Sequence, residues 1–173
     1  MTFNIIGLKT LDIFSQKDER GSFQKPFNRK NFENHNISFN IEESYISISN
    51  KNCLRGMHYQ KEPFAHDKFV ACVQGRALDV CVDLRPESET YGKVDSLIIE
   101  PGTKSVFIPK GVAHGFYSFQ DHTAIAYYVS SIYNPDYDAG VLWNSIDFDW
   151  PCKNPLVSDR DRGFIDINDL KFS

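Results

Sequence analysis

The chain has 173 residues with a formal net charge of −4, 41% hydrophobic residues and 24% charged residues. This length fits a single domain, which we place at residues 1–173, and the composition is typical of a soluble globular protein. The basic residues are scattered and no stretch approaches the ~20 apolar residues of a membrane span, so we expect neither a nucleic-acid partner nor a membrane.

The first third of the chain predicts short strands and one helix. Apolar patterning favours strands at residues 3–8, 10–14, 22–27 and 41–49. Pro26 places the third of these at a sheet edge, and the first could pair along its edge with a second subunit. Asn28 can cap a helix that reaches residue 36, with Phe32 as its buried anchor.

The rest of the chain predicts further short strands separated by Gly and Pro turns. Gly75 lies in a turn between two apolar runs, so residues 68–84 predict a hairpin. Further strands are expected at residues 93–100, 105–108, 113–119 and 123–131. This spacing is typical of an all-β sandwich or barrel. A helical turn is expected near residues 158–161, and three aromatic residues are expected to cover one end of the barrel: Trp143, Phe148 and Trp150.

The four cysteines show no CxxC pair and no zinc-binding spacing. Cys72 and Cys81 could lie opposite each other in the predicted hairpin, but buried free thiols are the simpler interpretation. The N-terminus has no basic region followed by an apolar run, so we expect no signal peptide. These features predict a cytoplasmic protein.

Four basic side chains precede and begin the predicted hairpin: Arg55, His58, His66 and Lys68. Burying a polar group without a partner costs a few kcal/mol, so we expect these side chains to line a cavity. Arg55 and His58 are three residues apart, and a regular strand would place them on opposite faces. We therefore predict a bulge or kink near Gly56 that turns both inward.

One interpretation of this cluster is a metal site. The stretch from Pro109 to His114 matches Pro-x-Gly-x-x-His, the second signature of cupin barrels, in which a tight turn delivers a histidine onto an inward strand face. His58, His66 and His114 could together bind zinc or iron. Against this, the charge of Lys68 would repel a cation.

The other interpretation is proton chemistry. His58 can accept a proton near neutral pH, and Lys68 could stabilise a developing enolate oxygen. Tyr127 could donate a proton from the far side; Tyr127 and Tyr128 point to opposite faces, and we expect Tyr127 to face the cavity. A carboxylate is needed to orient the imidazole, and spacing alone does not select it.

Several motifs spread along the chain occur together in one family. They are Arg20-Gly21-Ser22-Phe23, the stretch LRGMHYQ from Leu54, VCVDLR from Val80, FIPKGVAHGF from Phe107, Trp143-Asn144 and Asp149-Trp150-Pro151. Through these motifs the chain resembles the dTDP-4-dehydrorhamnose 3,5-epimerase family over nearly its whole length. The resemblance implies a cupin jelly roll with short helices near the N-terminal third and at the C-terminus. It also implies a homodimer that needs no metal and no cofactor, epimerises nucleotide-linked 4-keto-6-deoxyhexoses and serves deoxysugar biosynthesis.

The resemblance also assigns roles to individual residues. His58 would be the base, Asp161 its carboxylate partner, Lys68 the group that stabilises the enolate, and Tyr127 the acid on the opposite face. Other residues would bind the substrate: Arg55 the phosphate, His114 the sugar, and Arg20 the nucleotide, often from the neighbouring subunit. The remaining residues expected to bind substrate are Phe23, Lys25, Glu43, Tyr45, Gln60, Tyr133 and Asp138.

Three departures from the family pattern fall outside the proton-transfer residues. Glu43 and Tyr45 replace a Gln-x-Asn pair, Lys25 replaces a glutamate, and Ala139 and Leu142 replace two arginines. These positions belong to recognition of the nucleotide and outer sugar. The sequence therefore leaves the base, the sugar, and inversion at C3 alone or at C3 and C5 open. A metal-dependent cupin oxygenase or isomerase and a catalytically silent sugar-binding cupin remain as alternatives.

Overall fold

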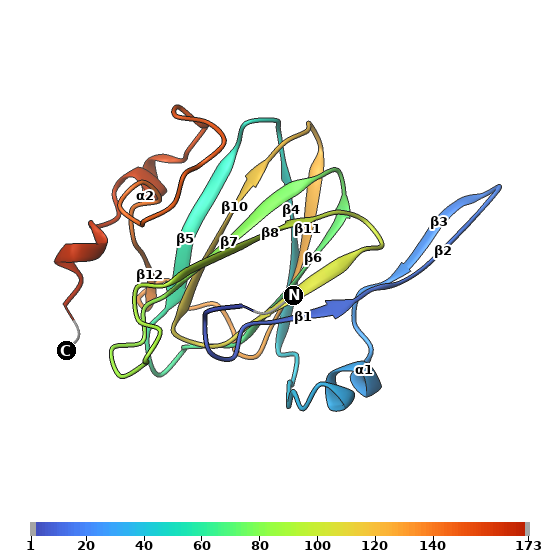
Figure 1. Cartoon of the computed structure of the whole chain (residues 1–173), viewed down its shortest axis with the longest axis horizontal. Helices are drawn as coiled ribbons and strands as arrows, with labels where there is room; N and C mark the ends of the chain where they lie inside the picture. The colour runs from blue at the N-terminus through green and yellow to red at the C-terminus, as the bar shows by residue number, and fades with distance from the viewer. Residues whose placement is uncertain (1–2, 172–173) are drawn as a thin grey trace.

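Two five-stranded antiparallel sheets face each other in a β-sandwich of the jelly-roll type (Figure 1). The computed structural model describes residues 3–171. The first sheet has the order β1 (Lys9–Asp12), β9 (Lys104–Ile108), β6 (Lys68–Gln74), β11 (Thr123–Val129) and β4 (Glu43–Ser49). The second has the order β12 (Asp138–Gly140), β5 (Leu54–Gln60), β10 (Val112–Ser118), β7 (Ala77–Asp83) and β8 (Val94–Ile99). The predicted all-β class and cupin jelly roll are confirmed.

Strands β6 and β7 follow each other in sequence but lie in different sheets, so the hairpin predicted over residues 68–84 is wrong. β6 pairs with β9 and β11, whereas β7 pairs with β8 and β10. Both strands are buried along most of their length, which requires a neighbouring strand on each side and cover on both faces. The turn at Gly75 therefore leads from one sheet to the other.

The core between the sheets is built from inward-facing side chains of both. Val70 and Cys72 on β6 pack in one cluster with Cys81 on β7 and Phe116 on β10. Truncating a fully buried aromatic side chain to alanine costs about 3–5 kcal/mol, so Phe116 alone carries a large share of a typical domain's stability. Cys72 and Cys81 are free thiols inside this core, as predicted.

The outer face of the second sheet carries a separate apolar cluster. Trp143, Phe148 and Trp150 pack there against Met57 and Val82. The sequence predicts these aromatic residues at one end of the barrel, and that prediction is wrong. Because β5 and β7 carry apolar side chains on their outer face, that face also needs cover, and the C-terminal segment supplies it.

Residues 3–8 form no strand, so the strand predicted there is wrong and the edge pairing with a second subunit loses its basis. Ile5 and Leu8 instead insert into the core, and the backbone N–H of Ile5 donates to Oδ2 of Asp95 at 2.7 Å. Gly7 between them has φ of 88°, which interrupts extended backbone. Strand β1 begins only at Lys9.

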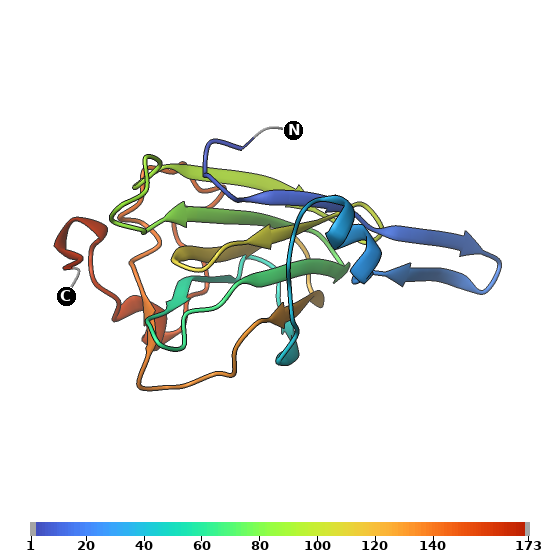
Figure 2. The same ribbon diagram turned by 90° about the horizontal axis from the view of Figure 1, so that it is seen from below.

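The strands predicted at residues 10–14 and 22–27 fall partly in a two-stranded hairpin made of β2 (Phe14–Asp18) and β3 (Gly21–Lys25). This hairpin extends away from the sandwich (Figure 1, Figure 2). Its strands pair only with each other. Nearly all of its residues are exposed.

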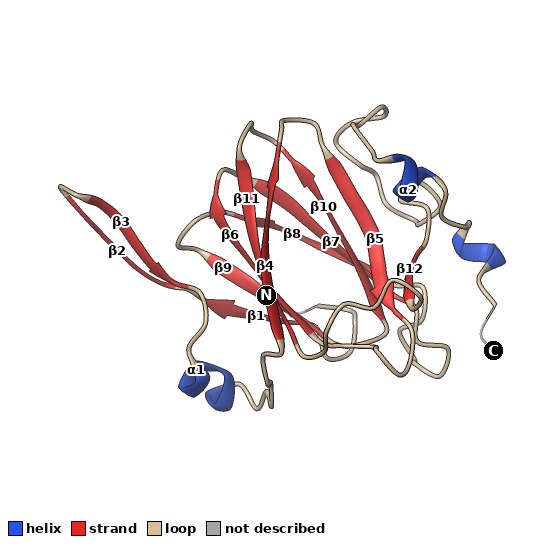
Figure 3. Cartoon of the chain, turned by 180° about the vertical axis from the view of Figure 1, so that it is seen from behind, coloured by secondary structure: helices blue, strands red, loops and turns tan. Residues whose placement is uncertain are grey.

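The helices lie outside the sheets, at opposite sides of the sandwich (Figure 3). Helix α1 (Arg29–Asn34) begins after Asn28, whose side chain accepts from the backbone N–H of Lys30, and its buried residue is Phe32, as predicted. Helix α2 (Asp159–Arg162) and the 3₁₀-helix η1 (Ile167–Asp169) follow near the C-terminus. Within residues 3–171 no helix has the length and apolar character to cross a membrane.

Candidate active site

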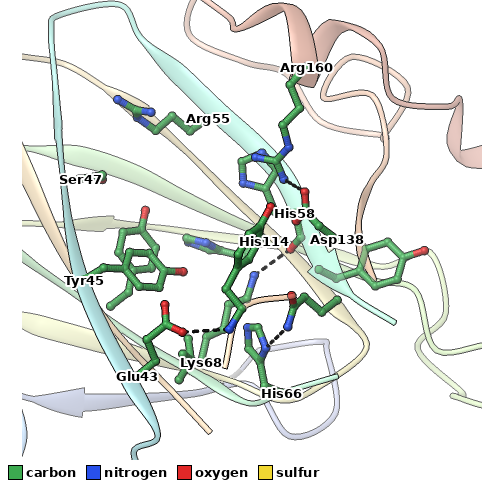
Figure 4. Close-up of a pocket in the computed structure, with 15 residues that line it drawn as sticks. Glu43, Tyr45, Ser47, Arg55, His58, His66, Lys68, His114, Asp138 and Arg160 are labelled. Carbon is green, nitrogen blue, oxygen red and sulfur yellow. Dashed lines mark hydrogen bonds and ion pairs between the residues drawn. The ribbon is translucent and has the colours of Figure 1, made fainter. Parts of the chain in front are cut away.

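A cavity of about 390 Å³ opens between the two sheets (Figure 4). Most of the residues that the sequence singled out line it: Glu43, Tyr45, Arg55, His58, Gln60, Lys68, His114, Tyr127, Tyr133 and Asp138. They come from β4, β5, β6, β10, β11, β12 and the loop after β11. The polar cluster in the middle of the chain therefore does line a cavity.

Strand β5 is distorted where the sequence predicted a kink. Gly56 has φ of +146°, and the pairing of β5 with β10 shifts register between His114 and Phe116. A Cβ atom on Gly56 would lie 2.6 Å from Cα of Gly115, so only glycine fits this close approach of two backbones. As a result Arg55 and His58 both line the cavity.

His58 and Asp161 form a hydrogen-bonded pair although 103 positions separate them. Nε2 of His58 lies 2.9 Å from Oδ1 of Asp161. Oδ2 of the same carboxylate accepts from the backbone N–H of Gly56 at 3.1 Å, and Ser158 caps α2 by accepting from the N–H of Asp161. Burial alone would raise the pKa of Asp161, but these hydrogen bonds, first of all the one to His58, hold it below its ordinary value. The carboxylate is therefore ionised.

The proton state of His58 follows from this pairing. An ionised carboxylate accepts only, so Nε2 carries the hydrogen and Nδ1 keeps its lone pair. Burial lowers the pKa of His58, against the opposing effect of Asp161, and the charges of Lys68 and Arg160 lower it further. At neutral pH His58 is an unprotonated base with a fixed ring orientation.

Lys68 supplies a buried positive charge beside this base. Its side chain is 7% exposed, and Nζ donates to the carbonyl oxygen of His58 at 3.0 Å. Burial lowers the pKa of Lys68 to about 8, which still leaves most of the ammonium groups charged at pH 7. The ammonium group has further N–H donors for a ligand oxygen.

Tyr127 lies on β11, in the sheet opposite to that of His58, and lines the cavity as predicted. Its neighbour Tyr128 packs on the other side of that sheet against Phe69. The ring of Tyr127 is stacked on that of Tyr45, with centroids 4.7 Å apart and planes 16° from parallel. Burial raises the pKa of Tyr127, so its hydroxyl stays protonated and can act only as a proton donor or hydrogen-bonding group. The stacking leaves the phenol ring little freedom to turn.

A second histidine–carboxylate pair lies deeper in the sandwich. Nε2 of His114 on β10 is 2.7 Å from Oδ2 of Asp79 on β7, and both residues are almost fully buried. Sequence reasoning did not single out Asp79. The available signal was a carboxylate inside an apolar strand, since a buried charge needs a partner.

Gln60 and His66 form a network at the cavity wall. Oε1 of Gln60 accepts from the backbone N–H of Asn134 at 2.7 Å, and its Nε2 lies 3.1 Å from Nδ1 of His66. The sequence predicts that His66 lines the cavity with the other basic side chains. It is 9% exposed and lines the cavity.

The mouth of the cavity carries charged side chains from three segments. Oε2 of Glu43 accepts from the backbone N–H of Tyr133 at 2.9 Å. Arg160 on α2 forms an ion pair with Asp138 on β12, and its Nη1 lies 3.9 Å from Oδ1 of Asp161. Arg160 was not expected at the site; its position next to Asp161 in the sequence was the available signal.

Three expected substrate-binding residues lie elsewhere. Arg20, Phe23 and Lys25 belong to the exposed hairpin of β2 and β3 and do not line this cavity. Arg20 forms an ion pair with Asp18 within the same hairpin. Their assignment to substrate binding stays a prediction.

The three-histidine alternative has no geometric support. Over residues 3–171 no three His, Cys, Asp or Glu side chains are placed to hold one metal ion. His58 and His114 instead each direct Nε2 to a different carboxylate.

Comparison with known proteins gives one consistent family. The sequence model of the dTDP-4-dehydrorhamnose 3,5-epimerases matches residues 2–169. The dTDP-4-dehydrorhamnose 3,5-epimerase of Shigella flexneri is 40% identical over 169 residues, which cover 92% of this chain and 90% of that protein.

Two solved structures share the fold over nearly the whole chain. The Legionella pneumophila 3,5-epimerase in complex with dTDP-4-keto-L-rhamnose has a TM-score of 0.91 and 30% identity, covering 99% of this chain and 93% of that chain. ChmJ, a 3′-monoepimerase from Streptomyces bikiniensis in complex with dTDP-quinovose, has a TM-score of 0.87 and 27% identity, covering 96% and 86%. The chain belongs to the dTDP-4-dehydrorhamnose 3,5-epimerase family.

Proposed function

We propose that this protein epimerises a nucleotide-linked 4-keto-6-deoxyhexose by removing a proton next to the C4 ketone and returning one to the opposite face. The observation that carries the proposal is the placement of His58 and Tyr127 on strands of opposite sheets around one cavity, with Lys68 bonded to His58. Inversion at a carbon requires a base and an acid on opposite faces of a planar intermediate, and this arrangement supplies them.

The reaction begins at Nδ1 of His58. This nitrogen takes the proton from the carbon next to the ketone, and the electron pair of the broken C–H bond moves onto the ketone oxygen to give an enolate. The imidazolium that forms is stabilised by the carboxylate of Asp161. The ammonium group of Lys68 stabilises the enolate oxygen, where negative charge develops.

Reprotonation completes the inversion. The hydroxyl of Tyr127 gives its proton to the other face of the same carbon, and the enolate electrons return to form the ketone. His58 then loses its extra proton to solvent, and the tyrosinate takes one up. Because burial raises the pKa of Tyr127, this regeneration is strongly favoured before the next turnover.

The nucleotide is expected at the cavity mouth, where Arg55 and Arg160 provide positive charge. Nε of Arg55 donates to Oγ of Ser49 at 3.0 Å, which fixes the stem while leaving other N–H groups free for a diphosphate. Since the relatives are named for dTDP-linked sugars, we infer dTDP for this chain too.

Two candidate outcomes differ in the number of centres inverted. The family name favours inversion at C3 and C5, whereas the likeness to a 3′-monoepimerase favours C3 alone. Mass spectrometry in heavy water, with a panel of dTDP-, UDP- and GDP-linked 4-keto-6-deoxyhexoses, separates them. Two deuterium atoms per sugar indicate inversion at both centres and one indicates a single centre; no label on any sugar would refute the proposal. Tyr127→Phe and His58→Asn should both abolish the epimerised product.

We also propose that the active form is a homodimer in which the β2–β3 hairpin of one chain reaches the cavity of the other. Arg20, Phe23 and Lys25 would then join the site that their own chain leaves incomplete. Exposed Ile46 and Ile48 on the edge strand β4 offer apolar surface for the contact.

Mixing two inactive variants tests the exchange. Arg20→Ala and His58→Asn chains, refolded together, should regain activity because one site of each mixed dimer receives both native residues. Absence of recovery in dimers confirmed by light scattering would contradict the shared site. The free state of all four cysteines supports a cytoplasmic location, which we also propose.

A further inference from the structure

The tyrosine proposed above as the proton donor is covered on one face by the ring of a second tyrosine. Tyr45 on β4 lies directly opposite Tyr127 on β11 in the antiparallel pairing of the two strands. Their rings are stacked, with centroids 4.7 Å apart and planes 16° from parallel. Both side chains line the cavity (Figure 4). The position of the phenol ring in the cavity is therefore linked to the side chain at position 45.

Tyr45 lies at the edge of its sheet, and this makes the contact open to a test. β4 is the edge strand next to β11 in the first sheet. Tyr45 is 43% exposed, whereas Tyr127 is only 7% exposed. Truncating Tyr45 would open space beside a buried phenol ring without removing a side chain of the core. We therefore expect variants of Tyr45 to fold.

A ring from the opposite sheet contacts Tyr127 as well. The imidazole of His114 on β10 meets the phenol ring edge to face, with centroids 6.0 Å apart and planes at 72°. His114 is itself held in place, because its Nε2 lies 2.7 Å from Oδ2 of the buried Asp79. The phenol ring thus lies between a fixed imidazole and the ring of Tyr45. It cannot swing about χ1 in the direction of β4 without displacing Tyr45.

The direction of the phenol hydroxyl decides what happens to each enolate. The imidazolium of His58 can return a proton to the face that lost it, which restores the starting sugar. Tyr127 can instead protonate the opposite face, which inverts the carbon. His58 is held by Asp161, and a misplacement of the competing donor by ~1 Å can cost about 10²-fold in rate. A phenol ring that swings would therefore lose this competition.

We propose that Tyr45 is a positioning residue that keeps the ring of Tyr127 directed at the sugar, so that the enolate is protonated on the inverting face. This proposal rests on the proposed function for the roles of His58 and Tyr127. Tyr45 replaces an asparagine of the family pattern, and asparagine has no ring to stack. The contact is therefore not part of the pattern that the chain shares with the family.

The mobility of the phenol ring tests the positioning without catalysis. Relaxation spectra of protein with ¹³C-labelled tyrosine rings, with Tyr127→Phe for assignment, should show a rigid Tyr127 ring in the wild type. Tyr45→Phe keeps a stacked ring and should leave Tyr127 rigid, whereas Tyr45→Ala should increase its motion. Ser44→Ala, at an exposed neighbouring position of β4, is the matched control and should change nothing. A Tyr127 ring as rigid in Tyr45→Ala as in the wild type would overturn the proposal.

The fate of the enolate tests the consequence for the reaction. Reactions in heavy water are stopped at low conversion, the starting sugar and the inverted product are separated, and mass spectrometry measures deuterium in each. The side chain of His58 is 25% exposed, so the proton that it returns can come from solvent. Tyr127→Phe, which lacks the acid, should label the starting sugar alone.

Tyr45→Ala should lower kcat about ten- to a hundredfold with little change in KM. The ratio of label in the starting sugar to label in the product should rise by a similar factor. Tyr45→Phe should keep the rate and the ratio near their wild-type values.

A slower Tyr45→Ala variant with an unchanged label ratio would show that Tyr45 does not direct the acid, and would overturn the proposal. A Phe variant as poor as the Ala variant would assign the effect to the hydroxyl of Tyr45 and would overturn it too. Failure of the proposed function is distinguishable, because the wild type would then label neither sugar while the spectra still report the mobility of the Tyr127 ring.

Discussion

Nζ of Lys68 donates a hydrogen bond of 3.0 Å to the backbone carbonyl oxygen of His58, which joins the two sheets at the floor of the cavity. Lys68 begins β6 in the first sheet and His58 lies near the end of β5 in the second. The ammonium group that we propose stabilises the enolate is thereby held close to the residue that we propose as the base. Preorganised charge of this kind needs no rearrangement during the reaction.

The alkaline limit of activity should come from Lys68. Its pKa is lowered to about 8, so the ammonium is charged below that pH and is lost as the pH rises through it. We expect kcat/KM to fall above about pH 8, and Lys68→Met to lower the rate by roughly 10²–10³-fold while removing this limb. Steady-state rates from pH 6 to 10 measure both, and an unchanged limb in Lys68→Met would assign it to another group.

The carboxylate of Asp161 should matter through the orientation and charge of His58. Asp161→Asn replaces an acceptor of the Nε2 hydrogen by an amide that can also donate, which favours the wrong tautomer. We expect kcat to fall by about 10²–10⁴-fold with little change in stability. Asp159→Asn is the matched control, because that carboxylate is exposed and pairs with Arg162 on the same helix. Equal losses in the two variants would point to a general effect on α2.

His58 should set the acidic limit of activity, with its pKa lowered first by burial and further by the charge of Arg160. This charge disfavours the protonated form of His58, so removing it should raise the pKa of His58 and move the acidic limb of kcat/KM to higher pH. We expect Arg160→Gln to shift the limb by about half a unit to one unit, and Arg160→Lys to keep it near the wild-type position. Arg162→Gln removes a charge from the exposed side of the same helix and should leave the profile unchanged. A profile of Arg160→Gln that overlays wild type would exclude the electrostatic role.

Asp83 should contribute stability and not chemistry. Its fully buried carboxylate accepts from Arg85, Ser88 and Thr90, and these bonds outweigh the effect of burial and lower its pKa to about 2 from 3.8. The contribution is therefore fully present above pH 3.8 and is lost as the pH falls through 2. We expect Asp83→Asn to lower the free energy of unfolding by about 2 kcal/mol at pH 7 and by less near pH 3, measured by urea denaturation.

A surface carboxylate provides the comparison for Asp83. Asp12 forms an exposed ion pair with Lys104, and Asp12→Asn should cost less than about 0.5 kcal/mol. If the two variants had equal free energies of unfolding, the buried network around Asp83 would contribute no more stability than a surface ion pair.

The sequence was most informative where a local rule fixes the outcome. Asn28 and Phe32 predicted α1 because capping and one buried anchor act within a few residues. The kink at Gly56 followed from the spacing of Arg55 and His58, since both had to face one side of a strand. Motif resemblance identified Asp161, which no spacing rule could have selected.

Contacts between distant segments were beyond such rules. The two apolar runs β6 and β7 look like a hairpin, but each is a central strand, and the choice of partner depends on burial on both faces. The role of Asp79 as the partner of His114 is visible only in the folded chain, where the two side chains lie 2.7 Å apart. Arg160 likewise joins the site only because α2 places it beside Asp138.

The amino-acid sequence by itself determined the family and the all-β class and pointed to the residues proposed as base, cation and acid, because these depend on residue types at fixed places along the chain. Only the tertiary structure decided which strands share a sheet, that Asp79 pairs with His114, and that His66 is buried at the cavity wall. The physical reason is that pairing and desolvation are properties of neighbours in space, and in a sandwich of crossing strands those neighbours lie far apart in sequence.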